Sequence, residues 1–373
     1  MDVVDPVSVV RFAVAVDLPG APPVDEQTDR TLTTAALNVV TAMRVEGLVH
    51  RALEIGRVHA SPLTTADVQQ AWIDAQRRSL TAEWWATETI RVLAAAELPT
   101  RVLKGIAVAH LDHADPSERV FGDADVLIRR GDLRRALVAL TAAGFSRIEP
   151  PVRGWWERRF SKAIMLRTPS GGELDLHLAI TGGFFGERID HDRLWSAPAE
   201  SFDLDGLTAH ALDLQGRWLH ACCHAVLGGG SGLRATRDVA QLLLLCEVDW
   251  RQVVRDATDD GVDAVVAQAV RDTWELLRLD PAHPAAQWAA HHEAPPDQRR
   301  ALAASLMANE TGWGPEGWST LQALSLFARA RFLTGIAWPS RANLRHRGRT
   351  RRRHLRIMAT TLRAVVRRRD AGE

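Results

Sequence analysis

Two aspartates lie one residue apart in an apolar stretch of the chain, with the residue type and spacing of a metal-binding site. The segment RVFGDADVLI is typical of a β-strand, and it carries Asp123 and Asp125. Because successive side chains on a strand point to opposite faces, the two carboxylates are expected to project together. Two acids on one face repel each other unless a cation lies between them. The pair therefore predicts a site for a divalent cation.

A third acid is predicted on a later strand. The segment GELDLHLAI alternates polar and apolar residues, so Glu173, Asp175 and His177 share one face. Asp-x-Asp alone is a weak signal, because two further pairs in the chain are interpreted as loop acids: Asp190 with Asp192, and Asp203 with Asp205. What distinguishes the first pair is its apolar strand and the later acid.

The elements that must position these acids follow one another between Leu98 and Gly144. TRVLK is predicted to be a short strand, Gly105 a turn, GIAVAHL a helix, RVFGDADVLI a strand, and residues 132–143 a helix. AIMLRTP and ELDLHLAI are then predicted to form a hairpin across residues 170–172. TGGFFGER, which follows, is predicted to be a glycine-rich loop. The acids would thus lie on neighbouring strands of one sheet.

The series LKG, R-x-x-G-D-x-D-x-L-I, helix, A-G-F and L-D-L-H resembles the nucleotidyltransferase superfamily of the DNA polymerase beta type. More narrowly, it resembles the uncharacterised bacterial branch in which Lys-Gly stands where other members have Gly-Ser. The resemblance extends roughly from Leu98 to Pro339. The chain departs from the superfamily pattern in having Ile106 after Gly105, and in a longer spacing from Gly105 to Asp123.

This resemblance implies a cofactor, a substrate and a set of site residues. The cofactor is Mg²⁺ or Mn²⁺, and the substrate is an NTP. The catalytic and metal-binding residues are Asp123, Asp125 and Asp175, with Asp175 also activating the acceptor. The nucleotide-binding residues are Lys104, Gly105, Arg119 and Gly122. His177 orients either Asp175 or the acceptor.

The expected fold class is α+β, with a small mixed β-sheet core between two helical regions. The length of 373 residues accommodates more than one domain. We expect a helical region over residues 1–97, the nucleotidyltransferase core over 98–205, a helical domain over 206–340 and a basic tail over 341–373. Within the first region, the apolar spacing from Asp29 to Ile55 predicts one amphipathic helix, and a second is predicted to begin near Thr64.

The formal net charge of zero hides a strong asymmetry. Of the 46 basic and 46 acidic residues, residues 341–373 hold 12 arginines and 2 acids, which leaves 34 basic and 44 acidic residues in the rest. The tail therefore predicts contact with a polyanion, which could be nucleic acid, an acidic membrane surface or the acidic body of the protein itself. Its apolar residues recur at helical spacing, as in an amphipathic basic helix.

Three cysteines, two of them adjacent, do not form a disulfide framework, and no run of 18 apolar residues predicts a membrane span. The N-terminus lacks the features of a signal peptide, so a cytoplasmic location is expected. His220 and His224 lie one helical turn apart beside Cys222 and Cys223. Zinc binding is disfavoured, because groups on one helix cannot converge on a tetrahedral ion. A role in the core and a place in the active-site cleft both stay open.

The sequence thus favours a metal-dependent nucleotidyltransferase. It would move a nucleoside monophosphate from an NTP to a hydroxyl-type acceptor on a small molecule, a peptide or a protein. The alternative is a catalytically weak relative that binds nucleotide or RNA through the basic tail. Arg237 and Asp238 are interpreted as a pair at the start of a helix.

Overall fold

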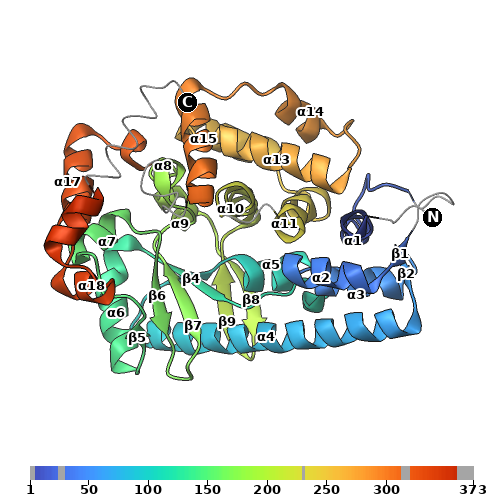
Figure 1. Cartoon of the computed structure of the whole chain (residues 1–373), viewed down its shortest axis with the longest axis horizontal. Coiled ribbons are helices and arrows are strands. Elements are labelled where there is room, and N and C mark those ends of the chain that lie inside the picture. The colour runs from blue at the N-terminus through green and yellow to red at the C-terminus, as the bar shows by residue number, and fades with distance from the viewer. Residues whose placement is uncertain (1–4, 24–29, 229–231, 312–319, 359–373) are drawn as a thin grey trace.

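The computed structural model describes residues 5–23, 30–228, 232–311 and 320–358. Seven strands form its central sheet: β3 (Thr100–Val102), β4 (Ala124–Ile128), β5 (Ser146–Arg147), β6 (Ala163–Arg167), β7 (Glu173–His177), β8 (Glu200–Leu204) and β9 (Leu207–Ala211). Their order across the sheet is β5-β6-β7-β4-β3-β9-β8 (Figure 1). Two short strands, β1 (Thr31–Leu32) and β2 (His59–Ala60), pair apart from it. The chain is an α+β protein, as the sequence predicts.

The sheet is mixed, and its two central strands carry the predicted acids. β4 runs parallel to β7 and antiparallel to β3, while β6 and β7 form the predicted antiparallel hairpin. In β4, Ala124, Val126 and Ile128 belong to the core on one face of the sheet. Because side chains alternate along a strand, Asp125 and Leu127 point to the opposite face.

The face that carries Val126 is covered by α4 (Pro62–Ala95) and α6 (Leu133–Ala142). The Ser61 hydroxyl caps α4 by accepting a hydrogen bond from the Thr64 N–H, and Pro62 occupies the first turn, where no N–H is needed. Apolar residues of α4 recur three or four positions apart and pack on the sheet: Ala82, Ala86, Ile90 and Leu93. Figure 1 shows α4 running along the lower edge of the molecule, from below β1 and β2 to below the central sheet.

The face that carries Leu127 belongs to a second core, which combines N-terminal and C-terminal helices. These helices are α1 (Pro6–Val14), α2 (Thr34–Met43), α3 (Glu46–Glu54), α10 (Leu214–Leu227), α11 (Leu233–Leu244), α12 (Trp250–Asp260), α13 (Asp263–Leu277), α14 (Pro284–His291) and α15 (Pro296–Thr311). The N-terminal helices are thus divided between the two cores. The predicted domain boundaries stay a prediction.

The remaining helices are shorter or peripheral. They are α5 (Lys104–Asp112), α7 (Gly154–Phe160), α8 (Gly183–Gly186), α9 (His191–Ser196), α17 (Leu326–Ala337) and α18 (Arg341–His346). Two 3₁₀ turns span Pro116–Glu118 and Arg130–Asp132, and residues 351–358 are also helical. No helix among the described residues is long and apolar enough to cross a membrane.

Three details of the structure differ from the sequence predictions. The helix predicted from Asp29 to Ile55 is two helices, because Arg44 adopts a left-handed conformation (φ 51°) that ends α2. The helical sequence predicted from residue 206 begins only at Leu214, since residues 207–211 form β9. The predicted glycine-rich loop contains α8, where Phe184 and Phe185 are buried in the second core and fix the segment.

The basic tail packs against the body of the protein at its beginning. The Ser340 hydroxyl and the Asn343 amide donate hydrogen bonds to the carbonyls of Pro151 and Pro150. His354 Nε2 lies 2.8 Å from the carbonyl oxygen of Ile336 in α17. Residues 341–358 therefore dock on the chain itself, whereas residues 359–373 of the predicted tail lie outside the described residues.

Candidate active site

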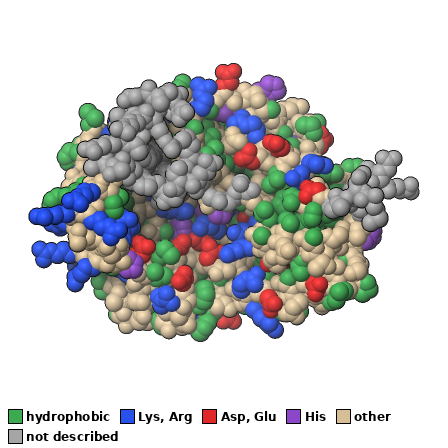
Figure 2. All heavy atoms as spheres, viewed as in Figure 1, with side chains coloured by type: hydrophobic (Ala, Val, Ile, Leu, Met, Phe, Trp, Pro, Cys, Tyr) green, Lys and Arg blue, Asp and Glu red, His purple; other side chains and the backbone are tan. Residues whose placement is uncertain are grey.

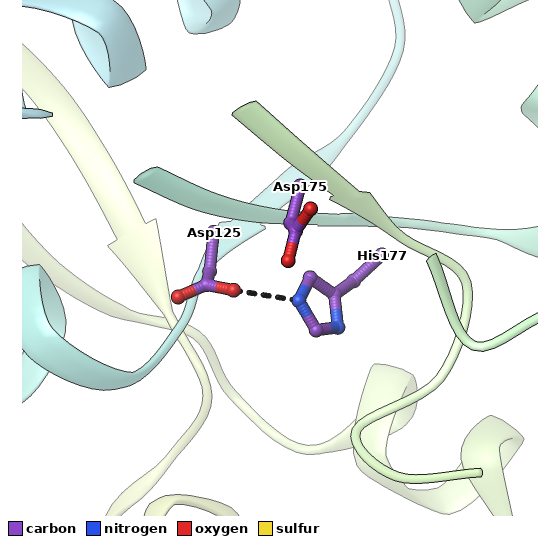
Figure 3. Close-up of side chains that lie close together, drawn as sticks. All are labelled: Asp125, Asp175 and His177. Carbon is purple, nitrogen blue, oxygen red and sulfur yellow. Dashed lines mark hydrogen bonds and ion pairs between the residues drawn. The ribbon is translucent and has the colours of Figure 1, made fainter. Parts of the chain in front are cut away.

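Two carboxylates and one imidazole converge where β4 and β7 lie side by side (Figure 3). The parallel register places Asp125 opposite Asp175, and Leu127 opposite His177. One ligand atom from each of Asp125, Asp175 and His177 lies within 4.8 Å of the other two. No second cluster of three or more His, Cys, Asp or Glu ligands comes this close in the described part of the chain. Figure 2 shows the hollow in which acidic, basic and histidine side chains gather below the upper helices.

Asp125 is the most constrained member of this group. It is only 2% exposed, and its Oδ1 accepts a hydrogen bond from Lys104 Nζ at 2.6 Å and lies 2.7 Å from His177 Nε2. Burial alone would raise the pKa of Asp125, but the charge of Lys104 and the contact with His177 hold it well below its usual value. Asp125 is therefore an ionised, buried carboxylate with a built-in counter-ion.

Lys104 reaches Asp125 from the first residue of α5, directly after β3. Its φ of 45° is left-handed, a conformation that costs free energy for a residue with a side chain. Burial would lower the pKa of Lys104, but the charges of Asp125, Asp123 and Asp175 outweigh it and raise the pKa. The strained backbone thus holds a charged ammonium group among the three acids.

His177 is fully enclosed between two hydrogen-bond acceptors. Its Nε2 faces Asp125, and its Nδ1 lies 3.2 Å from the carbonyl oxygen of Ala179. A ring that carries protons on both nitrogens satisfies both acceptors. A metal-ligating nitrogen carries no proton, so coordination through Nε2 would replace its contact with Asp125.

Asp175 is only partly buried and has no hydrogen-bond donor assigned among the described side chains. Burial is the main cause that raises the pKa of Asp175, and repulsion from Asp125 adds to it, while His177, Lys104 and Lys162 act in the opposite direction. The sequence predicts repulsion between the acids, but burial is the larger effect on the pKa of Asp175. A carboxylate with a raised pKa accepts a proton more readily, as a general base must.

The donor set fits a divalent cation. Carboxylate oxygens suit Mg²⁺ and Mn²⁺, and imidazole suits transition metals, so the mixed set is better matched to Mn²⁺ than to Mg²⁺. Asp123 lies just before β4, is exposed, and is not part of the three-residue group. The shared metal position predicted for Asp123 and Asp125 stays a prediction.

Gly105 and Gly122, predicted to contact nucleotide, have different surroundings. A Cβ on Gly105 would lie 2.5 Å from Cβ of Phe121, so only glycine allows the first turn of α5 to pack on that ring. A Cβ on Gly122 would meet only Nη1 of Arg44, at 3.9 Å. Gly105 is thus required by packing, while Gly122 leaves space beside Asp123.

Arg119, predicted to stabilise developing negative charge, is engaged by the protein itself. Its Nε and Nη2 donate to the two carboxylate oxygens of Asp238 at 2.6 and 2.7 Å, and its Nη1 donates to the carbonyl of Val120. Both side chains are buried. The predicted role of Arg119 in nucleotide binding stays a prediction, and the structure shows a structural ion pair between α11 and the segment before β4.

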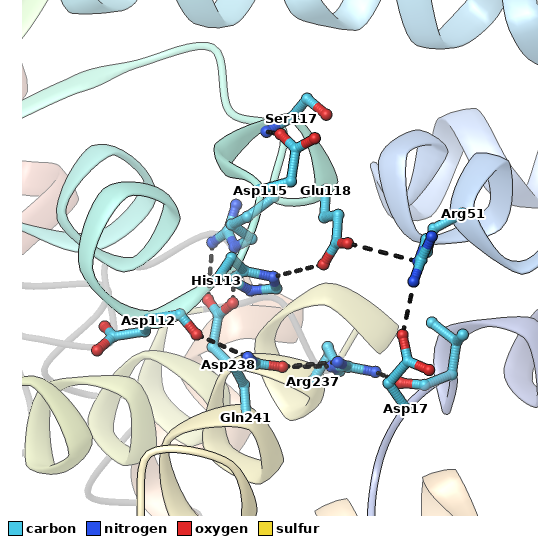
Figure 4. Close-up of polar contacts among 12 residues, drawn as sticks. Asp17, Arg51, Asp112, His113, Asp115, Ser117, Glu118, Arg237, Asp238 and Gln241 are labelled. Atoms are coloured by element: carbon cyan, nitrogen blue, oxygen red, sulfur yellow. Dashed lines mark hydrogen bonds and ion pairs between the residues drawn. The ribbon is translucent and has the colours of Figure 1, made fainter.

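Arg237 and Asp238 do not form the pair predicted from the sequence. They lie in the middle of α11, one position apart, and therefore point in different directions (Figure 4). Arg237 donates to the carbonyls of Val14 and Val16 and to the side chain of Gln241, which links α11 to the end of α1. Sequence adjacency was the misleading signal, because each side chain has a distant partner.

His220 and His224, whose place the sequence leaves open, lie close to Lys104. Both line a small cavity together with Lys104 and Asp238. The Nε2 atom of His220 is buried without a hydrogen-bond partner among the described residues. Burial, followed by the charge of Lys104, lowers the pKa of His220 well below its usual value and that of His224 to about 4. Both rings are therefore neutral near pH 7.

Comparison with known proteins agrees with the geometry. A family model described as uncharacterised nucleotidyltransferase matches residues 31–278, which include the whole sheet, α4 and the helices that cover the site. No curated protein and no solved structure matches the chain. Because the match covers more than half of the chain, this protein belongs to that nucleotidyltransferase family.

Proposed function

We propose that the protein uses a divalent cation to transfer a nucleoside monophosphate from an NTP to a hydroxyl group. The acceptor is a small molecule, a peptide or a protein. The observation that carries the proposal is the convergence of Asp125, Asp175 and His177 next to Lys104. Family membership supports nucleotidyl transfer in general. The cation, the NTP and the acceptor class are parts of the proposal.

In the proposed reaction, the acceptor oxygen attacks the α-phosphorus and forms a new P–O bond. The bond from the α-phosphorus to the oxygen that bridges to the β-phosphate breaks, and pyrophosphate leaves. Asp175 takes the proton of the acceptor hydroxyl, a role for which its partial exposure and raised pKa are suited. Asp123, Asp125, Asp175 and His177 would hold the cation, which would neutralise charge on the phosphates.

The start of α5 is proposed to bind the phosphate groups. Helix N-termini present N–H groups that no residue within the helix accepts, and their dipole favours anions. No side chain caps α5, and Gly105 lies in its first turn. Lys104, held by Asp125 in the absence of substrate, adds a positive charge at the same place.

The proposal is tested by incubating the protein with each NTP and Mn²⁺ or Mg²⁺, and by following pyrophosphate release together with the mass of candidate acceptors. Asp175→Asn is expected to abolish transfer while it retains nucleotide binding, because the amide is a poor base and a poor ligand. Asp123→Asn is expected to weaken nucleotide binding that depends on the cation. An Asp175→Asn variant with wild-type turnover would overturn the assignment.

Matched controls exist for both substitutions. Asp272 is also partly buried, and burial also raises its pKa, but it lies in α13 and pairs with Gln268. Asp203 is exposed like Asp123, and its carboxylate accepts from the Gly206 N–H in the β8–β9 hairpin. Asp272→Asn and Asp203→Asn are expected to leave turnover unchanged.

Binding of nucleotide or RNA with little chemistry is the second candidate function. It is supported by exposed arginines in α18 and residues 351–358, among them Arg345, Arg352 and Arg353. The same assay separates the two candidates, since the second predicts retention of nucleotide or RNA without release of pyrophosphate.

A further inference from the structure

Two arginines outside the sequence motifs flank the edge of the active site at Asp123. Arg44 ends α2, and its Nη1 lies 3.9 Å from the position of a Cβ on Gly122, the residue before Asp123. Arg234 lies in the first turn of α11. A Cβ on Gly232, just before α11, would lie 3.4 Å from Sδ of Met43, so the end of α2 and the start of α11 are in contact. Two helices from distant parts of the sequence thus bring Arg44 and Arg234 to the same edge.

Neither guanidinium group has a hydrogen-bonding partner in the part of the chain that the structure describes. Within the described ranges, no hydrogen bond or ion pair is assigned to Arg44 or Arg234. The buried arginines nearby differ in this respect: Arg119 is paired with Asp238, and Arg217 with Asp112. Arg234 is partly buried without a bound acceptor and Arg44 is exposed, so the donors of both guanidinium groups are available to a ligand.

Arg234 is within electrostatic range of both Asp123 and the Arg119–Asp238 ion pair. Burial, followed by repulsion from Arg119, lowers the pKa of Arg234 to about 10, while Asp238 and Asp123 raise it and Arg44 lowers it further. Glu46 is also within range of both Arg44 and Arg234, but its carboxylate is paired with Arg78 at 3.1 Å. Positive charge at this edge therefore exceeds the negative charge that faces it.

We propose that Arg44 and Arg234 form a binding site for the β- and γ-phosphates of the NTP, which we call the clamp. The inference rests on the proposed function and adds to it the residues that distinguish a triphosphate from a monophosphate. Planar guanidinium groups bind phosphate oxygens through paired hydrogen bonds. Asp123 raises the pKa of both Lys104 and Arg234, so the start of α5 and the arginine pair lie within range of the same acid.

The clamp combines residues from the N-terminal and the C-terminal helices. Arg44 follows a helix of the N-terminal region, and Arg234 belongs to a C-terminal helix, whereas Asp123 precedes the sheet strand β4. A polyphosphate at this edge would contact three segments that are remote in sequence. A nucleoside monophosphate, which lacks the β- and γ-phosphates, would not reach the arginine pair.

The test measures binding of Mg²⁺ complexes of an NTP, the matching NMP and inorganic tripolyphosphate to the full-length protein by calorimetry. Arg44→Gln and Arg234→Gln are each expected to weaken binding of the NTP and of tripolyphosphate by about ten- to a hundredfold, the usual loss for one charged hydrogen-bonding group. Affinity for the NMP is expected to stay within twofold. Arg234→Lys is expected to retain part of the affinity, because the charge remains.

The matched control is Arg77→Gln, which removes the same charge from an arginine on α4 that is 71% exposed and paired with Asp74. It is expected to change none of the three affinities. Equal losses for NTP and NMP, or no loss in either arginine variant, would overturn the inference. Arg44 is exposed, so Arg44→Gln tests the site even if Arg234→Gln does not fold.

Failure of this inference is distinguishable from failure of the proposed function. A wild-type protein that releases pyrophosphate and depends on Asp175, with unchanged KM for NTP in both arginine variants, overturns only the clamp. A wild-type protein that binds tripolyphosphate through the two arginines but never releases pyrophosphate from any NTP supports the clamp and contradicts the transferase assignment.

Discussion

At the scale of single residues, the candidate active site depends on one oxygen atom that has two neighbours. Asp125 Oδ1 faces both the ammonium group of Lys104 and the imidazole of His177. A cation that binds Asp125 must compete with these contacts or use the other oxygen. Without a bound cation, Asp125 and Lys104 form an internal salt bridge. Its contribution to stability can be measured without knowing the substrate.

Replacing Lys104 by Met is expected to destabilise the fold by about 3–5 kcal/mol at pH 7, since it leaves a buried carboxylate without its main counter-ion. The pKa of Asp125 is lowered in the folded protein, so this pair stabilises the fold above the usual carboxyl pKa and the contribution is lost as the pH falls. The loss in Lys104→Met should therefore shrink in acid. Urea unfolding at pH 7 and at pH 3, which lies below the usual carboxyl pKa, measures it.

Lys162→Met is the natural control, because Lys162 is the second of only two lysines in the chain. It is partly exposed and has no assigned ion pair among the described residues, so its removal is expected to cost less than about 1 kcal/mol. Equal destabilisation by both substitutions would contradict the counter-ion role of Lys104.

The histidines beside the site predict sensitivity to acid. The pKa of His224 is lowered to about 4 in the folded protein, chiefly by burial, and unfolding returns it to about 6.5. The unfolded chain then binds more protons between these values, so stability falls as the pH drops from 6.5 towards 4. His224→Gln should flatten that slope in urea unfolding measured at pH 7.5 and 5. His59→Gln, at an exposed position, should leave the slope unchanged.

At the scale of elements, the β6–β7 hairpin is held in place by a contact with α4. A Cβ on Gly172 would lie 1.9 Å from Cε2 of Trp85, so no other residue fits while this ring stays in place. Because β7 carries Asp175 and His177, the contact between a turn and a helix sets the position of two active-site residues.

Gly172→Ala is expected to destabilise the protein by about 1–3 kcal/mol through overpacking, and to lower turnover because β7 shifts. Gly154→Ala, where a Cβ would meet nothing within 4 Å, is the control and should change neither quantity by much. Thermal unfolding and pyrophosphate release measure the two effects. Normal turnover in a destabilised Gly172→Ala variant would contradict the expectation that the position of the β6–β7 hairpin controls the reaction.

Local sequence patterns were sufficient to predict the strands of the site. Alternation of polar and apolar residues predicted the hairpin and the shared face of Asp175 and His177, because this period follows directly from strand geometry. The same patterns could not predict that Asp125 pairs with Lys104, or that Arg119 pairs with Asp238. Those contacts join segments 21 and 119 residues apart, and local periodicity contains no information on such pairs.

At the scale of the whole molecule, charge is distributed unevenly between the body and the tail. Arg345, Arg352 and Arg353 are exposed. Basic side chains gather at the left end of the view in Figure 2, where Figure 1 shows α17 and α18. Replacing all three by Gln is expected to lower the salt concentration at which the protein elutes from heparin, because polyanion affinity follows the number of neutralised charges. Pyrophosphate release should be unchanged, since none of the three faces the acids.

The control for the tail removes three exposed arginines elsewhere, Arg77, Arg91 and Arg134. If both triple variants elute alike, polyanion affinity reflects net charge and not the tail. The basic composition of the tail was evident from the sequence. Its docking on α17 was not, because it depends on contacts of individual side chains such as His354 with the body.

Helix α4 has a mechanical consequence for how substrates enter and leave. It spans about 50 Å in one uninterrupted run, contains no glycine, and has no proline after Pro62. Val68 near its start belongs to one core and Ile90 near its end to the other, so the helix connects the two cores rigidly. A motion that separated the two cores would have to bend α4. In the proposed reaction, exchange of nucleotide and pyrophosphate is therefore expected to require displacement of α11 and not of α4. Amide hydrogen exchange should then change with NTP at the start of α11 and not along the middle of α4.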